Sequence, residues 1–235
     1  MKINQKKIIK ITHNILDYME RIFFLIVFFI GVYFIYDTAY VFYYNSADRV
    51  LGYKPDAINA ETLLNLSEDC VAWITLDDSE IDYPIMQSDD NIKYLNTDPE
   101  GNYALAGSIF LDFRNSPDFS DKYSLVYGHN MEGKKMFGPL INWAKKDYFD
   151  EHLTGTLTAG DIEYEFNIFA YVETDTSEEI VFNPIGNYPI DYIKKNAKNY
   201  VEPKEGNLVV LSTCKSPTST KRNILCGTIV EKGKQ

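Results

Sequence analysis

The run IFFLIVFFIGVYFIY, residues 22–36, contains no charged side chain. Its 15 residues fall short of the roughly 20 that a helix needs to cross a bilayer. Asp37 interrupts the run, but TAYVFYY extends the apolar character to Tyr44. Asp37 would then lie near the lipid headgroups, and the tyrosines would form an interfacial aromatic belt. We therefore predict a membrane-spanning helix over residues 22–44.

Basic residues precede this segment. Residues 1–21 carry five Lys or Arg against two acidic residues, and such a flank stays in the cytoplasm. We expect residues 1–21 to be a cytoplasmic tail and residues 22–44 to be an uncleaved signal-anchor in the cell membrane, with the rest of the chain exported. A cleaved signal peptide is the alternative, but only NSA at 45–47 approaches a cleavage site. A buried core helix would not explain the basic flank.

The part of the chain that follows is acidic. Residues 45–235 hold 18 Lys and Arg against 31 Asp and Glu, which argues against a nucleic-acid partner. Cys70, Cys214 and Cys226 form neither a disulfide framework nor a CxxC zinc pair. We expect no metal and no cofactor, and we expect Cys70 and Cys226 to be small buried core residues. An exported chain with so few cysteines has room for one free, functional thiol.

Short runs with strand-like alternation dominate the acidic part. Gly, Asp, Asn and Pro separate them, as turns separate strands. Eight such strands in one domain indicate a mostly β fold whose sheet closes into a barrel, because closure removes exposed edges. The predicted strands are 71–76, 81–86, 107–112, 123–128, 155–160, 164–172, 207–213 and 224–230.

Three further segments have helical spacing of apolar residues. They are AINAETLLNLS at 57–67, KKMFGPLINWAKKDYF at 134–149 and PIDYIKKNAKNY at 189–200.

The last of these helices lies in a connection over residues 173–206, which is long enough to be functional. We expect this connection to form one wall of a binding groove, with Ile185 or Ile193 as the residues that contact what is bound; the region 88–96 is the alternative. Residues 45–60 are expected to be a connector and residues 61–235 the exported domain.

Three residues form a candidate catalytic constellation. Cys214 ends the apolar run LVVLSTC, and Arg222 begins the next run eight residues later. If these runs are antiparallel neighbours, the arginine returns beside the cysteine, where a permanent cation can stabilise a thiolate or an oxyanion. His129 follows a strand and a glycine, whereas His13 precedes the membrane segment and His152 lies in a polar turn. His129 is therefore the best acid–base partner for the thiol.

These motifs resemble those of the sortases, membrane-anchored cysteine transpeptidases of Gram-positive bacteria. The resemblance rests on VVLSTC with its arginine and on YGHNM at 127–131; VAWITLDDSEIDYPIMQSDDNIKYL at 71–95 and GSIFLDFRN at 107–115 resemble the class B branch. It implies an eight-stranded barrel and a triad. The implied catalytic residues are His129, Cys214 and Arg222, and the implied substrate-binding residues are Asn91, Leu95, Tyr127 and Ser212. Lys215 departs from the acidic residue common at that position, which leaves the sorting motif open.

The resemblance also implies the reaction. Cys214 would cleave an exported protein after the threonine of a C-terminal sorting motif of the Asn-Pro-x-Thr kind. The thioacyl product would pass to an amine of a peptidoglycan precursor or of a pilin. A pilin-polymerising sortase and a non-catalytic membrane-tethered binding module are the alternatives. The cysteine contexts of papain-like proteases and of L,D-transpeptidases are absent.

Overall fold

The computed structural model describes residues 5–44, 66–131, 135–214 and 219–233. The chain divides into two compact units, residues 1–43 and residues 44–235. The predicted connector at 45–60 and nearly all of the predicted helix at 57–67 lie outside the described residues.

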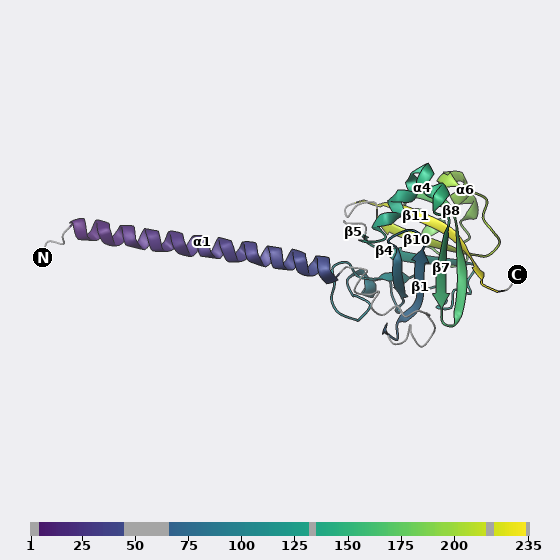
Figure 1. Cartoon of the computed structure of the whole chain (residues 1–235), viewed down its shortest axis with the longest axis horizontal. Coiled ribbons are helices and arrows are strands. Elements are labelled where there is room, and N and C mark those ends of the chain that lie inside the picture. Colours follow the sequence, from purple (N-terminus) through teal and green to yellow (C-terminus); the bar gives the residue numbers. More distant parts are fainter. Residues whose placement is uncertain (1–4, 45–65, 132–134, 215–218, 234–235) are drawn as a thin grey trace. The chain divides into compact units, whose positions relative to one another are not determined.

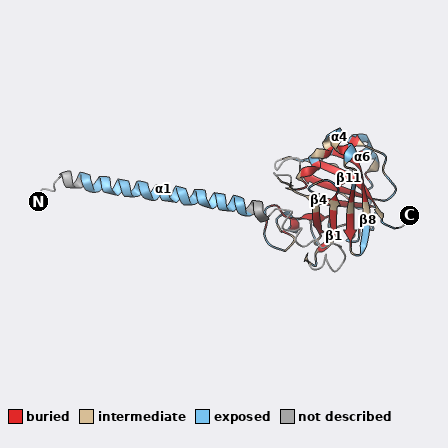
Figure 2. Ribbon diagram, in the orientation of Figure 1, coloured by how far each residue is buried: buried red, intermediate tan, exposed pale blue. Residues whose placement is uncertain are grey.

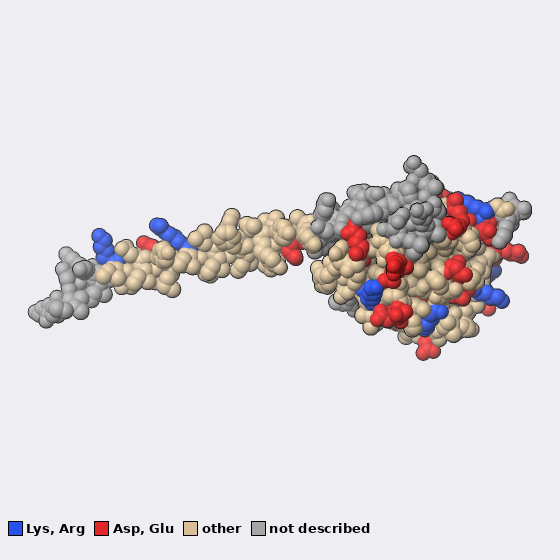
Figure 3. Space-filling model, turned by 90° about the horizontal axis from the view of Figure 1, so that it is seen from below, with Lys and Arg blue, Asp and Glu red and all other residues tan. Residues whose placement is uncertain are grey.

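The first unit is one helix, α1 (Gln5–Tyr44), of 40 residues. Its segment Ile9–Tyr40 has a mean hydropathy of 2.2 and is long and apolar enough to cross a membrane. Side chains over residues 9–40 are exposed (Figure 2), and a long stretch of the helix surface carries no charge (Figure 3). The helix begins well before residue 22, so most of the predicted basic tail is helical too.

The second unit is a closed barrel of eight strands, which confirms the predicted fold class. Around the barrel the strand order is β11-β10-β4-β3-β2-β1-β7-β8, and β11 also pairs with β8, which closes the barrel (Figure 1). β2 pairs with β3 and β4 with β10 in parallel; the other pairs are antiparallel. The strands are β1 (Cys70–Leu76), β2 (Asp82–Met86), β3 (Ile109–Leu111), β4 (Tyr123–Gly128), β7 (Thr154–Ala159), β8 (Ile162–Asp175), β10 (Asn207–Cys214) and β11 (Lys221–Glu231).

Both faces of β10 are buried, which fixes its position firmly. Val209 and Leu211 belong to the main core cluster, whereas Leu208 and Val210 alternate with them into a second cluster. The second cluster also contains Ile193 of α6 (Ile190–Asn196). Because strand side chains alternate with a period of two, a shift by one residue would exchange the two faces. The end of β10 is therefore held in one register.

The helix predicted over residues 134–149 is wrong in its first half. Residues 135–136 form β6 (Lys135–Met136), which pairs with β5 (Asn130–Met131), and the chain then forms η2 (Gly138–Ala144), a 3-10 helix. An α-helix, α4 (Lys146–Glu151), begins only after the extended Lys145. Because residues 135–136 are extended and pair with β5, a continuous helix over this segment cannot form.

The helix predicted over residues 189–200 ends four residues early. Ala197 is extended, and β9 (Ala197–Tyr200) pairs with β8 at the edge of the sheet. Strand pairing therefore overrides the helical spacing in that half of the segment. Two further short elements are η1 (Lys93–Leu95) and α5 (Glu179–Phe182).

Candidate active site

Strand register brings the three predicted catalytic residues to one end of the barrel. Cys214, the last residue of β10, pairs across the antiparallel ladder with Arg222 of β11. On the other side of β10, Thr213 pairs in parallel with Gly128, the last residue of β4, and His129 follows directly. The arginine therefore lies on one of the strands that flank the cysteine, and the histidine directly follows the other. The antiparallel neighbours expected from the sequence are the neighbours observed.

A glycine precedes His129 because an aromatic ring packs on the backbone there. A Cβ atom at position 128 would lie 2.6 Å from Cδ2 of Phe137 and 3.2 Å from Cγ1 of Ile109. The backbone N–H of Phe137 donates to the His129 carbonyl at 3.0 Å. The fully buried Phe137 therefore holds the backbone of Gly128 through its ring and the backbone of His129 through its N–H group.

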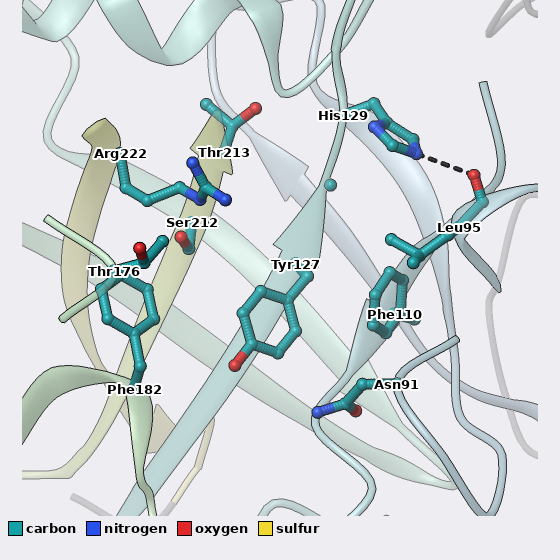
Figure 4. A pocket seen from close by; sticks show the side chains of 11 residues that line it. Asn91, Leu95, Phe110, Tyr127, His129, Thr176, Phe182, Ser212, Thr213 and Arg222 are labelled. Carbon is teal, nitrogen blue, oxygen red and sulfur yellow. Dashed lines mark hydrogen bonds between the residues drawn. The ribbon is translucent and has the colours of Figure 1, made fainter. Parts of the chain in front are cut away.

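The imidazole of His129 is oriented by a main-chain carbonyl. Its Nε2 lies 2.8 Å from the carbonyl oxygen of Leu95, at the end of η1. A carbonyl oxygen only accepts hydrogen bonds, so this geometry requires a proton on Nε2. Figure 4 shows the other ring nitrogen on the side of the ring that faces Thr213 and Arg222.

The guanidinium of Arg222 is held by carbonyl oxygens of its own strand and loop. Nη1 donates to the carbonyls of Ser219 at 2.9 Å and Lys221 at 3.2 Å. Neither acceptor is a carboxylate, so neither neutralises the positive charge. Figure 4 shows the guanidinium beside Ser212 and Thr213, on the opposite side of the pocket from His129.

A pocket of about 320 Å³ lies between these groups (Figure 4). All four residues predicted to bind substrate line it. Sequence reasoning missed five further lining residues, although Thr176 and Phe182 belong to the connection that was expected to form a groove wall, and Phe110 belongs to the motif GSIFLDFRN. The complete lining is Asn91, Leu95, Phe110, Tyr127, Gly128, His129, Thr176, Phe182, Ser212, Thr213 and Arg222.

Two hydroxyl groups of this lining lack a hydrogen-bond partner in the described part of the chain. Ser212 and Thr213 are 1% and 2% exposed, and neither side-chain oxygen has a partner there. Unpaired buried hydroxyls are costly in a folded protein. Both residues line the pocket, but the two hydroxyl oxygens themselves are buried.

A buried carboxylate that contacts two lining residues was not predicted as a site residue. The side chain of Asp112 is fully buried, and Nε and Nη2 of Arg114 each donate to it at 2.8 Å. Nδ2 of Asn91 and the hydroxyl of Tyr127 donate to the same carboxylate at 2.9 Å and 3.1 Å. Burial alone would raise the pKa of Asp112, but the bonds from Arg114 and Asn91 outweigh it and hold that pKa below its ordinary value.

The tyrosine in this network keeps its proton. Burial, followed by the neighbouring carboxylate of Asp112, raises the pKa of Tyr127 well above its ordinary value. The amide of Asn91 is occupied at both ends, because its Oδ1 accepts from the backbone N–H of Phe113 at 3.0 Å. The polar groups of Asn91 and Tyr127, two predicted substrate-binding residues, are therefore hydrogen-bonded to other residues of the protein.

Three other residues singled out in the sequence, Cys70, Cys226 and His152, do not line this pocket. Cys70 and Cys226 are buried, as expected, and burial raises the pKa of Cys70 to about 12 and also raises the pKa of Cys226. His152 is not in a solvated turn, since its ring stacks on Tyr148 at 3.7 Å.

The expectation that Ile193 reads the peptide is wrong, because this side chain is fully buried in the second core cluster. Ile185 is 58% exposed but does not line the pocket. The 173–206 connection contributes Thr176 and Phe182 to the pocket instead. Within the ranges that the structure describes, no group of three His, Cys, Asp or Glu side chains could hold a metal ion.

Comparison with known proteins identifies the family. The sequence model described as the Sortase domain matches residues 74–230. Sortase B of Listeria monocytogenes is 37% identical over 181 residues, which cover 73% of this chain and 72% of that protein.

Solved structures agree with this match. Spy0129, a Streptococcus pyogenes class B sortase involved in pilus biogenesis, superposes with a TM-score of 0.66 at 39% identity and covers 72% of this chain and 97% of its own. Staphylococcus aureus Sortase B superposes with a TM-score of 0.69 at 25% identity over 83% and 99% of the two chains. The chain belongs to the sortase family of cysteine transpeptidases and is similar to its class B members.

Proposed function

We propose that Cys214, His129 and Arg222 carry out the transpeptidation at this site. The observation that carries the proposal is the strand register, with Cys214 opposite Arg222 on one side and with Thr213 opposite Gly128, the residue before His129, on the other. A thiol nucleophile needs a proton-transfer partner and a group that stabilises the oxyanion, and the two flanking strands supply one of each.

In the first step, the thiolate of Cys214 attacks the carbonyl carbon of the threonine in a sorting motif of the Asn-Pro-x-Thr kind. The C–S bond forms, and the charge on the carbonyl oxygen is stabilised by the Arg222 guanidinium. As the peptide C–N bond breaks, the His129 imidazolium gives its proton to the departing amine. A thioester on Cys214 and a free amine result.

In the second step, an acceptor amine attacks the thioester. His129 takes a proton from the attacking nitrogen, the C–S bond breaks, and Cys214 leaves as the thiolate. The new amide joins the exported protein to the acceptor, and the original charge state of the pair is restored. Water in place of the amine gives slow hydrolysis.

The pocket supports an extended peptide as the substrate. Its lining combines apolar side chains such as Leu95, Phe110 and Phe182 with polar side chains such as Thr176 and Arg222. Pockets for side chains combined with polar groups for the backbone are the usual means of holding an extended peptide. We propose that Asn91, Leu95, Tyr127 and Ser212 bind the substrate, alongside the lining residues that were not predicted.

We further propose a cell-membrane location. The apolar helix Ile9–Tyr40 and the basic residues before residue 22 support a single-pass anchor, with residues 1–21 in the cytoplasm, 22–44 in the membrane, 45–60 as a connector and 61–235 outside. Substrates would then be exported proteins with a C-terminal sorting signal.

The acceptor amine defines two versions of this function. A peptidoglycan precursor would anchor proteins to the cell wall, whereas a pilin amine would build a polymer. The 39% identity to a class B sortase involved in pilus biogenesis favours including the pilin acceptor in the test. Supplying each amine with one thioacyl donor peptide distinguishes the two, since only the true acceptor gives the ligated product.

Peptide cleavage by matched variants tests the proposal. A fluorophore–quencher peptide with Asn-Pro-Ala-Thr is incubated with the wild type and with Cys214→Ala, His129→Ala and Arg222→Ala. We expect no cleavage by Cys214→Ala and a loss of about 10²–10³ in kcat for Arg222→Ala, the usual effect of one oxyanion donor. His152→Ala is the matched control and should stay near wild type. Undiminished cleavage by Cys214→Ala would end the proposal.

A further inference from the structure

The two walls of the pocket come from segments that are far apart in the chain. Asn91, Leu95 and Phe110 lie on one side in Figure 4, and Thr176 and Phe182 lie on the other. A groove that binds an extended peptide must keep such walls at a constant spacing, because the peptide has to contact both walls at once. The question is which contacts set this spacing.

One guanidinium spans the two segments. Nη2 of Arg114 donates to the carboxylate of Asp112 at 2.8 Å and to the carbonyl oxygen of Phe182 at 3.0 Å. Its Nη1 donates to Oδ1 of Asn183 at 3.0 Å. Arg114 thus joins the end of β3 to α5, across 68 residues of sequence.

The carboxylate at the centre of this connection also holds the other wall. Oδ2 of Asp112 accepts from Nδ2 of Asn91 and from the hydroxyl of Tyr127, both of which line the pocket. Nε2 of Gln87 adds a bond to the backbone carbonyl of Asp112 at 3.0 Å. Asp112 and Arg114 therefore contact three lining residues, yet neither side chain lines the pocket itself.

Stability alone does not account for such a pair. The Asp112 side chain is 0% exposed and that of Arg114 is 28% exposed, so forming the pair removes a full charge from water. Replacing a buried ion pair with apolar side chains of similar volume is often neutral or stabilising. The rigid fork of arginine, however, fixes several acceptors in one plane, which lysine and apolar side chains cannot do.

We propose that Asp112 and Arg114 are positioning residues that hold the two walls of the pocket at the spacing a bound peptide requires. The inference rests on the proposed function, because it takes this pocket as the peptide site. Asp112 acts through Asn91 and Tyr127, and Arg114 acts through Phe182. The pair therefore determines the affinity for the peptide and not the intrinsic reactivity of the thiol.

Arg114→Lys tests this role because lysine keeps the positive charge but lacks the planar guanidinium that donates to several acceptors at once. The Kd of a fluorescent Asn-Pro-Ala-Thr peptide is measured on the Cys214→Ala background, and KM, kcat and iodoacetamide alkylation of Cys214 are measured on the wild-type background. We expect Kd and KM to rise about tenfold, as expected when charge-assisted hydrogen bonds are lost, while kcat and the alkylation rate change less than about twofold.

Asn183→Ala provides a second route that leaves the Asp112–Arg114 pair intact. It removes one acceptor of the guanidinium and should raise Kd in the same direction, so it decides the question if Arg114→Lys does not fold. In the double variant, the two effects on Kd should be less than multiplicative, because both act through one guanidinium. Lys204→Met is the matched control, since it breaks a 2.8 Å ion pair with Glu165 that is remote from the lining residues.

The outcomes separate this inference from the proposed function. Equal peptide binding by the wild type, Arg114→Lys and Asn183→Ala would overturn the positioning role alone. So would a parallel fall in the alkylation rate, because it would mean that the pair acts on the thiol. Absence of peptide binding by every variant, wild type included, would overturn both.

Discussion

Nε2 of His129 lies 2.8 Å from the carbonyl oxygen of Leu95, a residue 34 positions earlier in the chain. The carbonyl cannot donate, so it selects the Nε2–H form of the imidazole and leaves Nδ1 as the nitrogen for the proposed proton exchange with the thiol or the substrate. Leu95 was expected only as a pocket residue. Its main chain also sets the orientation of the His129 imidazole, the proposed acid–base group.

This contact predicts the tautomer of His129. Long-range ¹H–¹⁵N correlation spectra of the neutral imidazole should show the proton on Nε2, with Nδ1 as the unprotonated nitrogen. His152 is an internal comparison, because its Nδ1 lies 2.7 Å from the carbonyl oxygen of Tyr148 and should therefore be the protonated nitrogen. A His129 spectrum with the same pattern as His152 would contradict the geometry.

The three thiols should differ sharply in reactivity. Cys70 and Cys226 are buried, and burial raises the pKa of each, so the thiolate that reacts with iodoacetamide is scarce at both positions. We expect Cys214 to be alkylated at least about 100-fold faster than either, as judged by peptide mass spectrometry at pH 7.5. Comparable rates at all three positions would instead favour a non-catalytic binding module with this fold.

Gly128→Ala should disturb the site through packing. The new methyl group would clash with the Phe137 ring, and overpacking of this kind costs about 1–3 kcal/mol in the free energy of unfolding. Peptide cleavage should fall further than the population of folded protein does, because the clash lies next to His129.

Gly160→Ala is the control for this prediction. It lies in the β7–β8 turn at φ +58° with no atom within 4 Å of the new Cβ, so its cost of about 1–2 kcal/mol is one of backbone strain alone. Both variants are compared by urea unfolding and by peptide cleavage. Loss of activity in Gly160→Ala as large as in Gly128→Ala would show that stability alone explains the effect.

Asp112 should make the stability of the domain depend on pH. Its pKa in the folded state is below the unfolded value of about 3.9, so the carboxylate stabilises the fold above that pH. This contribution is lost as the pH falls from about 4 through the folded-state pKa. Urea unfolding between pH 6 and pH 3 should therefore show a smaller loss of stability in Asp112→Asn than in the wild type. Identical pH dependence in the two proteins would contradict the lowered pKa.

The barrel could be predicted because its strands are locally encoded. Each has alternating or continuous apolar residues bounded by turn residues, and the eight observed strands overlap the eight predicted ones. The pairing of Cys214 with Arg222 could be predicted as well, because a short loop between two strands leaves few registers. The two helix predictions failed where strand pairing with β5 or β8 overrode the helical spacing of apolar residues. No local sequence pattern shows that strand pairing wins over helix formation there.

The connection through Asp112 and Arg114 could not be predicted from the sequence. Two residues apart at a strand end, they resemble an ordinary exposed pair in FLDFRN. Their proposed role depends on the contacts of Arg114 with Phe182 and Asn183, which lie 68 and 69 residues away in the sequence. Only the fold brings these groups together.

The central claim is that Cys214 forms a covalent acyl intermediate with the sorting peptide, and mass spectrometry of the intact protein tests it most directly. The wild type is mixed with the Asn-Pro-Ala-Thr peptide without an acceptor amine, quenched in acid within seconds, and digested to locate the adduct. We predict a mass increase equal to the acyl fragment that ends in threonine, carried by Cys214, sensitive to hydroxylamine and absent from Cys214→Ala. Cleavage of the peptide with no adduct on the wild type, or an adduct that persists in Cys214→Ala, would contradict the account.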